Sequence, residues 1–117
     1  MASQDSPAEA AEGRSIAELR DEYPSGFRIL VQNESIGYLL DALMDALPST
    51  EFTKSELAAD AGVSRQSLYT HLDLLLALDV LAPVEDTSPR RYRVNPESEL
   101  LELLHRVNGT VNGKLSL

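Results

Sequence analysis

Apolar residues recur at intervals of three and four through most of the chain, and this spacing predicts a mainly helical protein. The firmest case lies between Asn33 and Pro48, where one face of an amphipathic helix is apolar. Its apolar positions are Ile36, Leu39, Leu40, Leu43, Met44 and Leu47. A shorter helix is predicted after Ser15, because Ser15 and Glu18 match a capping box, and Pro24 ends it.

Two further helices follow, with a tight turn between them. Thr53 and Glu56 form a second capping box, which predicts a helix of about two turns ending at Gly62. Ser64 then caps a longer helix that runs to about Asp79. The inward positions of this longer helix are Leu68, Leu72, Leu75 and Leu76.

The C-terminal third predicts a hairpin and one more helix. Residues 80–84 and 91–94 are β-favouring segments around a turn rich in Asp, Thr, Ser and Pro. A last helix begins after Pro96 and fades at Gly109 and Gly113. Its apolar stripe consists of Leu100, Leu101, Leu103, Leu104 and Val107. Residues 27–31, "FRILV", fit either a short strand or the start of a helix.

The order helix, helix, tight turn, helix, hairpin, helix predicts a mainly α fold with a small β-hairpin. We interpret it as a winged helix-turn-helix with an additional C-terminal dimerisation helix. Residues 1–14 are expected to be a disordered acidic tail. Residues 15–96 are expected to form the DNA-binding domain with an N-terminal extension, and residues 97–117 the dimerisation helix and a tail.

The charge pattern qualifies this interpretation. The chain has 19 acidic and 10 basic residues, a net charge of -9, with the surplus spread along its length. A protein with this net charge gains little affinity from general electrostatic attraction to DNA, because that attraction depends on Lys and Arg neutralising the phosphates. Two windows nevertheless hold no Asp or Glu: residues 61–72, "AGVSRQSLYTHL", and residues 87–96, "TSPRRYRVNP".

The first of these windows predicts a surface that approaches DNA. Helical spacing turns its polar side chains outward, with Ser67 at the boundary. The candidate contacts are Ser64, Arg65, Gln66, Ser67, Tyr69 and Thr70. Arg pairs with guanine and Gln with adenine in the major groove, while hydroxyl groups reach bases or phosphates. The structural alternative is that Arg65 and Gln66 are solvated surface residues.

The second window predicts backbone contacts from the hairpin. Its candidate residues are Arg90, Arg91 and Arg93, which suit a phosphate backbone or minor groove. The alternative is that they pair with Glu85 or Asp86 across the hairpin. Tyr92 is expected to face the core, as is His71. Lys54, at the start of the second capped helix, is a further candidate phosphate contact.

Catalysis is not expected. The chain has no cysteine and no glycine-rich phosphate loop, and His71 and His105 lie on separate helices without an acidic partner at ligand spacing. We therefore expect no enzyme activity, no metal site and no cofactor. A ligand pocket between the helix of residues 33–47 and the last helix is conceivable, although nothing polar marks it. The sequence has no apolar run long enough for a membrane span and no secretion signal, which predicts a cytoplasmic protein.

Two longer stretches carry a family resemblance. "FTKSELAADAGVSRQSLYTHLDLLLALDVL" and "RRYRVNPESELLELL" resemble winged-helix transcription regulators common in halophilic archaea, similar in layout to the MarR, ArsR and PadR groups. The match covers about residues 33–107. It implies base contact from the window of residues 61–72 and backbone contact from the hairpin arginines. Relatives often have a basic residue where Thr70 stands. The size also resembles that of the oxidative-stress regulators of such organisms.

The resemblance also implies a homodimer on double-stranded DNA. The leucine stripe of the last helix is wider than one small domain covers, and a second copy would cover it. Two-fold pairing places the recognition helices on half-sites about one helical turn apart, so the operator is expected to be pseudo-palindromic. The alternative is that the last helix folds back on its own domain.

Excess acid with only two lysines, Lys54 and Lys114, is typical of proteins from cytoplasm rich in potassium. Counterion release weakens at high salt, so binding must depend on short-range contacts. We hypothesise that acidic residues at the edge of the interface bind K⁺ that is retained or taken up with DNA. A competing function is a winged-helix module that binds an acidic protein surface in a larger assembly.

Overall fold

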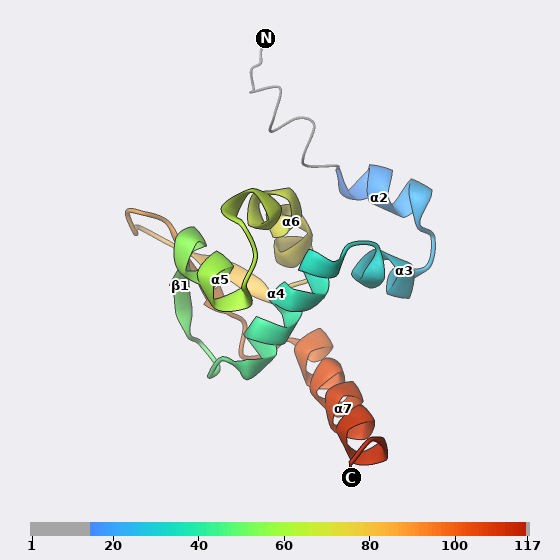
Figure 1. The fold of residues 1–117 in the computed structure, drawn as a ribbon. Coiled ribbons are helices and arrows are strands. Elements are labelled where there is room, and N and C mark those ends of the chain that lie inside the picture. The colour runs from blue at the N-terminus through green and yellow to red at the C-terminus, as the bar shows by residue number, and fades with distance from the viewer. Residues whose placement is uncertain (1–14, 117) are drawn as a thin grey trace.

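The computed structural model describes residues 15–116, and the predicted tail of residues 1–14 lies outside them. Within this range six helices and one small three-stranded antiparallel sheet form a mainly helical fold (Figure 1). The described part begins with α2 (Ile16–Glu22) and α3 (Gly26–Val31). Ser15 forms the predicted capping box of α2, and residues 27–31 are helical.

The next three helices are those predicted from the sequence: α4 (Glu34–Asp45), α5 (Lys54–Ala61) and α6 (Arg65–Ala77). Gly62 ends α5 with φ at 74°, a left-handed conformation that glycine adopts without a Cβ penalty. The N–H groups of Gly62 and Val63 both donate to carbonyl oxygens in the last turn of α5. These bonds close the short turn that places α6 against α5.

The sheet has one strand more than the predicted hairpin. Strands β2 (Leu81–Val84) and β3 (Arg91–Val94) are the hairpin, and β1 (Glu51–Thr53) pairs with the other edge of β3. Phe52 of β1 lies opposite Tyr92 of β3. The sequence pattern does not predict β1, because three residues are too few to show alternation and the partner strand is distant along the chain.

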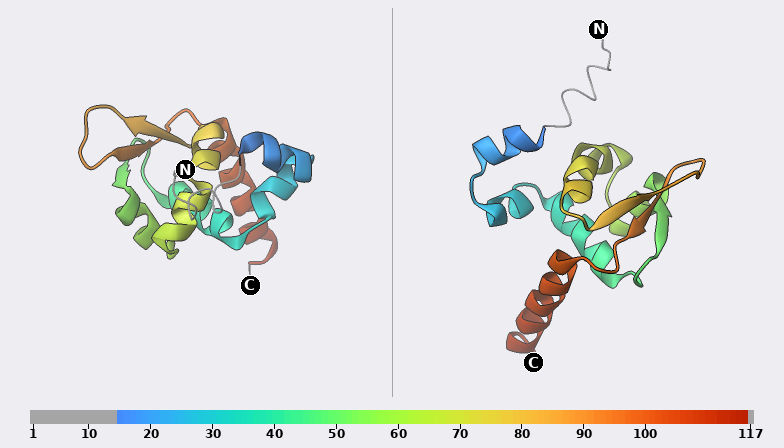
Figure 2. Two further views of the ribbon diagram at one scale, coloured as in Figure 1. Left: turned by 90° about the horizontal axis from the view of Figure 1, so that it is seen from above. Right: turned by 180° about the vertical axis from the view of Figure 1, so that it is seen from behind.

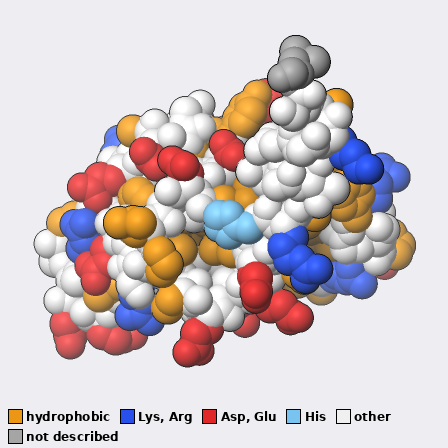
Figure 3. Space-filling model, turned by 90° about the horizontal axis from the view of Figure 1, so that it is seen from below, with side chains coloured by type: hydrophobic (Ala, Val, Ile, Leu, Met, Phe, Trp, Pro, Cys, Tyr) orange, Lys and Arg blue, Asp and Glu red, His pale blue; other side chains and the backbone are white. Residues whose placement is uncertain are grey.

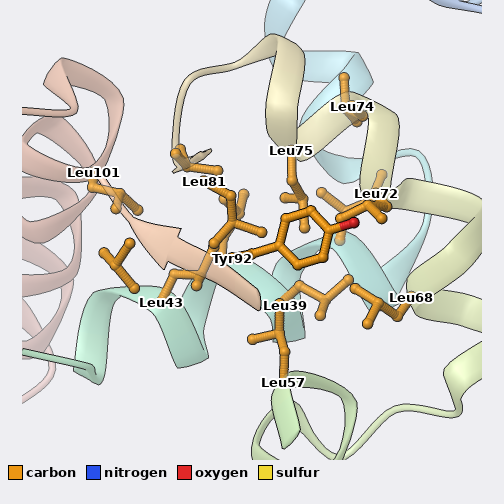
Figure 4. Close-up of a cluster of buried hydrophobic side chains, with 14 of the residues drawn as sticks. Leu39, Leu43, Leu57, Leu68, Leu72, Leu74, Leu75, Leu81, Tyr92 and Leu101 are labelled. Carbon is orange, nitrogen blue, oxygen red and sulfur yellow. The ribbon is translucent and has the colours of Figure 1, made fainter. Parts of the chain in front are cut away.

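One hydrophobic core joins the helices to the sheet. Its most deeply buried large side chains are Ile36, Leu39, Leu43, Leu57, Leu68, Leu75, Val80 and Leu81. Tyr92 points from β3 into this cluster, toward α4 and α6 (Figure 4). Tyr92 and His71 are both buried, as predicted. In α6 the structure buries Leu74, whereas Leu76, one of the predicted inward residues, is half-buried.

Helix α7 (Glu99–Lys114) leaves the body of the molecule and projects away from it (Figures 1 and 2). Only its first turns pack on the domain: Leu101 is 6% exposed within the core, and Leu100 and Leu104 are half-buried against the core. Leu101 is therefore covered by its own chain, which corrects the prediction that it faces a partner. The alternative that the last helix folds back on its own domain is therefore correct for the first turns of α7 and not for the rest.

Candidate nucleic-acid interface

The first turns of α6 present polar side chains to solvent. Ser64 precedes the helix, and its hydroxyl oxygen accepts the N–H of Ser67 at 3.0 Å, which caps the N-terminus. Arg65, Gln66 and Tyr69 are exposed, as predicted, and Ser67 is half-buried at the boundary. The helix start thus combines the positive end of the helix dipole with donor-rich side chains, a surface suited to a polyanion.

Helix α5 holds two of these side chains in place. Arg65 Nη1 donates a hydrogen bond of 3.1 Å to Ser55 Oγ. The ammonium group of Lys54 lies 4.9 Å from the centroid of the Tyr69 ring, a cation–π distance. The structure therefore brings Lys54, Ser55, Arg65 and Tyr69 together where the starts of α5 and α6 meet.

Beyond Thr70, Asp73 and Ala77 are the exposed residues of α6. Leu68, His71 and Leu72 are buried, so His71 is not available to a ligand. Thr70, expected to point outward, is half-buried, and its hydroxyl donates to the Gln66 carbonyl oxygen at 3.0 Å. Because the hydroxyl proton is used in this hydrogen bond to the backbone, the Thr70 oxygen can accept a further hydrogen bond but cannot donate one.

Arg91 is engaged within the molecule. Its Nε lies 3.3 Å from Glu51 Oε1, and its Nη2 lies 3.3 Å from Glu56 Oε1. Nη2 also donates to the Glu51 carbonyl oxygen at 3.3 Å. The pairing partners are thus on β1 and α5, and not Glu85 or Asp86 of the hairpin. Arg91 ties the base of the hairpin to the start of α5.

Glu56 serves two of these contacts at once. Its carboxylate accepts the N–H of Thr53 at 2.8 Å, which completes the predicted capping box of α5. That backbone hydrogen bond is the main cause of a lowered pKa at Glu56, and the positive charge of Arg91 adds to it. Glu56 is therefore held in its charged form, which suits both a helix N-terminus and an arginine partner.

Two hairpin arginines are left to solvent. Arg90 and Arg93 are exposed, and within residues 15–116 neither forms an ion pair. The loop between the strands is organised by Thr87, whose hydroxyl donates to the Val84 carbonyl oxygen at 3.1 Å and accepts the Arg91 N–H at 2.9 Å. Of the three predicted hairpin contacts, Arg90 and Arg93 are free to meet an external anion without breaking an internal pair.

The hairpin loop and α5 lie on the side of the molecule opposite to α7 (Figure 1). A partner bound along α7 would leave the start of α6 and the hairpin uncovered. Figure 3, which views the molecule from below, shows acidic side chains over the left and lower part of that face, with hydrophobic side chains between them.

Sequence reasoning missed two residues of this region. Ser55 gives no signal in the sequence, because its contact with Arg65 depends on the packing of two helices. Glu51 was not singled out, because its contact with Arg91 depends on the unpredicted strand β1. Glu56 carried a signal, its capping box, but that signal is local and does not reveal the distant arginine.

The described residues 15–116 contain no group of three or more His, Cys, Asp or Glu side chains arranged to hold a metal ion. In the same range no helix has both the length and the apolar character required to cross a membrane. Comparison of the chain with protein-family models, with curated proteins and with solved structures finds no match in any of the three. An assignment of function therefore depends on the residues and their geometry.

Proposed function

We propose that this protein is a sequence-specific DNA-binding transcription regulator of the winged helix-turn-helix type. The observation that carries the proposal is the acid-free, exposed start of α6, set beside α5 by a hydrogen-bonded turn at Gly62. A short helix, a tight turn and a longer helix with an accessible N-terminal half form the arrangement that reads a major groove. The resemblance to haloarchaeal regulators agrees with this proposal.

In this proposal the side chains have separate roles. Arg65 and Gln66 read base edges, and the Ser55 contact restricts the conformations open to the Arg65 side chain. Lys54 contacts a backbone phosphate, and Tyr69 restrains it through the ring contact. Arg90 and Arg93 contact the backbone beside the groove, and they complete the wing of the fold. The remaining candidates, Ser64, Ser67 and Thr70, contribute hydroxyl groups near the helix start.

The functional unit is proposed to be a cytoplasmic homodimer on a pseudo-palindromic operator. Helix α7 lies away from the hairpin and α5, so pairing through α7 leaves two copies of the DNA surface accessible. Two-fold symmetry then presents two α6 helices to half-sites about one turn of DNA apart. No cofactor, metal site or catalytic step is part of this proposal.

Arg65→Ala tests the proposal. A bidentate arginine–guanine contact is worth about 1–3 kcal/mol, so the variant is expected to bind its site roughly 5- to 150-fold more weakly. The measurement is fluorescence anisotropy with a genomic DNA pool at about 2 M KCl, a salt level at which general attraction is weak. Fragments retained by the native protein are sequenced and are expected to share a two-fold motif.

Arg28→Ala is the matched control. Arg28 is an exposed helical arginine on α3, which lies on the opposite side of the molecule from α5 and the hairpin (Figure 1). It is expected to leave DNA affinity unchanged. The proposal would be contradicted if the folded native protein retained none of the DNA fragments. That result would favour the competing function, a module that presents the same arginines to an acidic protein surface.

A further inference from the structure

The free part of α7 carries an apolar face that residues 15–116 do not cover. Three side chains spaced four residues apart lie on this face, which we call the α7 stripe: Leu103, Val107 and Val111. They are 44%, 57% and 47% exposed. Arg106 and Thr110 border the same shallow surface. None of these three side chains belongs to the core or packs against it, so the folding of residues 15–116 leaves the stripe exposed.

The sequence of this segment does not sustain a helix on its own. Residues 107–114 read "VNGTVNGK", which contains two glycines, two asparagines, two valines and a threonine. All of these have low helix propensity, and isolated helices are marginal even for favourable sequences. Helix α7 nevertheless extends to Lys114. A contact that buries the stripe supplies the stabilisation that the local sequence lacks.

The charges along α7 indicate what covers the stripe. The first turn carries Glu99 and Glu102, and the last turn carries Lys114. Two copies of this helix laid side by side in opposite directions bring the acidic end of each to the basic end of the other. The helix dipoles are then antiparallel, which is also favourable. Parallel pairing instead places like charges together at both ends.

We infer that the α7 stripe binds the α7 stripe of a second copy of this chain in antiparallel orientation, with the two-fold axis passing beside Val107. Val107 is the middle residue of the stripe and lies near the midpoint of the helix, so Val107 meets Val107. Leu103 of each copy meets Val111 of the other. This inference rests on the proposed homodimer and specifies the residues through which it forms.

Single cysteines test the orientation, since the native chain has none. In the full-length protein Val107→Cys is expected to form a covalent dimer readily under oxidation or with a short bis-maleimide. Leu103→Cys and Val111→Cys are each expected to cross-link poorly alone and well when mixed. Leu47→Cys is the control, because Leu47 is 78% exposed but lies outside α7. About tenfold more dimer is expected for Val107→Cys than for this control, because pairing raises the local thiol concentration.

Two results would overturn the inference. Efficient self-cross-linking of both Leu103→Cys and Val111→Cys would show parallel pairing. Monomeric protein by light scattering, with cross-linking of Val107→Cys no better than the control, would show that the stripe does not pair with a second copy. DNA binding by the same variants separates this inference from the proposed function. A variant that binds DNA without pairing overturns the pairing alone, whereas one that pairs without binding DNA overturns the function alone.

Discussion

His71 shows how one buried side chain makes stability depend on pH. Burial lowers the pKa of its imidazole below the usual 6.5, because desolvation disfavours the charged form. The unfolded chain therefore takes up a proton that the folded chain resists as the pH falls through about 6.5. Stability is complete above this pH, and it decreases as the pH falls from there toward the folded-state pKa.

Replacement of His71 by leucine is expected to remove this dependence. The native protein should lose stability between about pH 7.5 and 5.5, and His71→Leu should lose less over the same window. The measurement is the midpoint of denaturant unfolding at both pH values. His105→Gln is the control for the removal of a histidine, because His105 is an exposed residue on α7. Equal losses in His71→Leu and the native protein would refute the assignment.

At the scale of elements, replacement by alanine is expected to have opposite effects on stability at two glycines, because their backbone conformations differ. Gly62 has φ at 74°, and no atom lies within 4 Å of an added Cβ. Gly62→Ala is therefore destabilising through backbone strain alone, by about 1–2 kcal/mol. Gly37 is an exposed residue inside α4, also with open space around it, so Gly37→Ala is expected to stabilise by about 0.5–1 kcal/mol.

Thermal or denaturant unfolding of the two alanine variants checks this pair. Shifts of the same sign would contradict the account of the α5–α6 turn. DNA affinity is then compared under conditions where both variants are folded. A greater loss of affinity in Gly62→Ala than in Gly37→Ala would show that DNA recognition depends on the angle between α5 and α6. That comparison connects the turn to the proposed function.

The sequence predicts an element well when the residues that determine it lie close to it along the chain. The helices that begin at Ile16, Lys54 and Arg65 were predicted because their capping residues lie within a few positions of the helix start. Strand β1 was missed because its pairing with β3 is a long-range contact. For the same reason the exposed residues of α6 were predicted, while the partners of Arg91 were not.

At the scale of the whole molecule, the distribution of charge predicts an unusual response to salt. The chain has a net charge of -9, and the proposed DNA surface offers few cationic side chains. Binding then releases few counterions, and K⁺ held at acidic residues beside DNA offsets part of that release. We expect the plot of log affinity against log KCl to be nearly flat between about 0.5 and 3 M, as anisotropy titrations would show. A slope as steep as that of a basic repressor would contradict this expectation.

The junction between β3 and α7 has a consequence for spacing on DNA. Asn95 Nδ2 donates to the Asp79 carbonyl oxygen at 2.8 Å, and the Ser98 hydroxyl caps α7. The end of α6, the end of β3 and the start of α7 therefore meet at one hydrogen-bonded point. One residue inserted in the turn between Asn95 and Ser98 would change the direction in which α7 leaves the sheet. In a homodimer paired through α7, such an insertion would alter the separation of the half-sites and leave the bases read within each half-site unchanged.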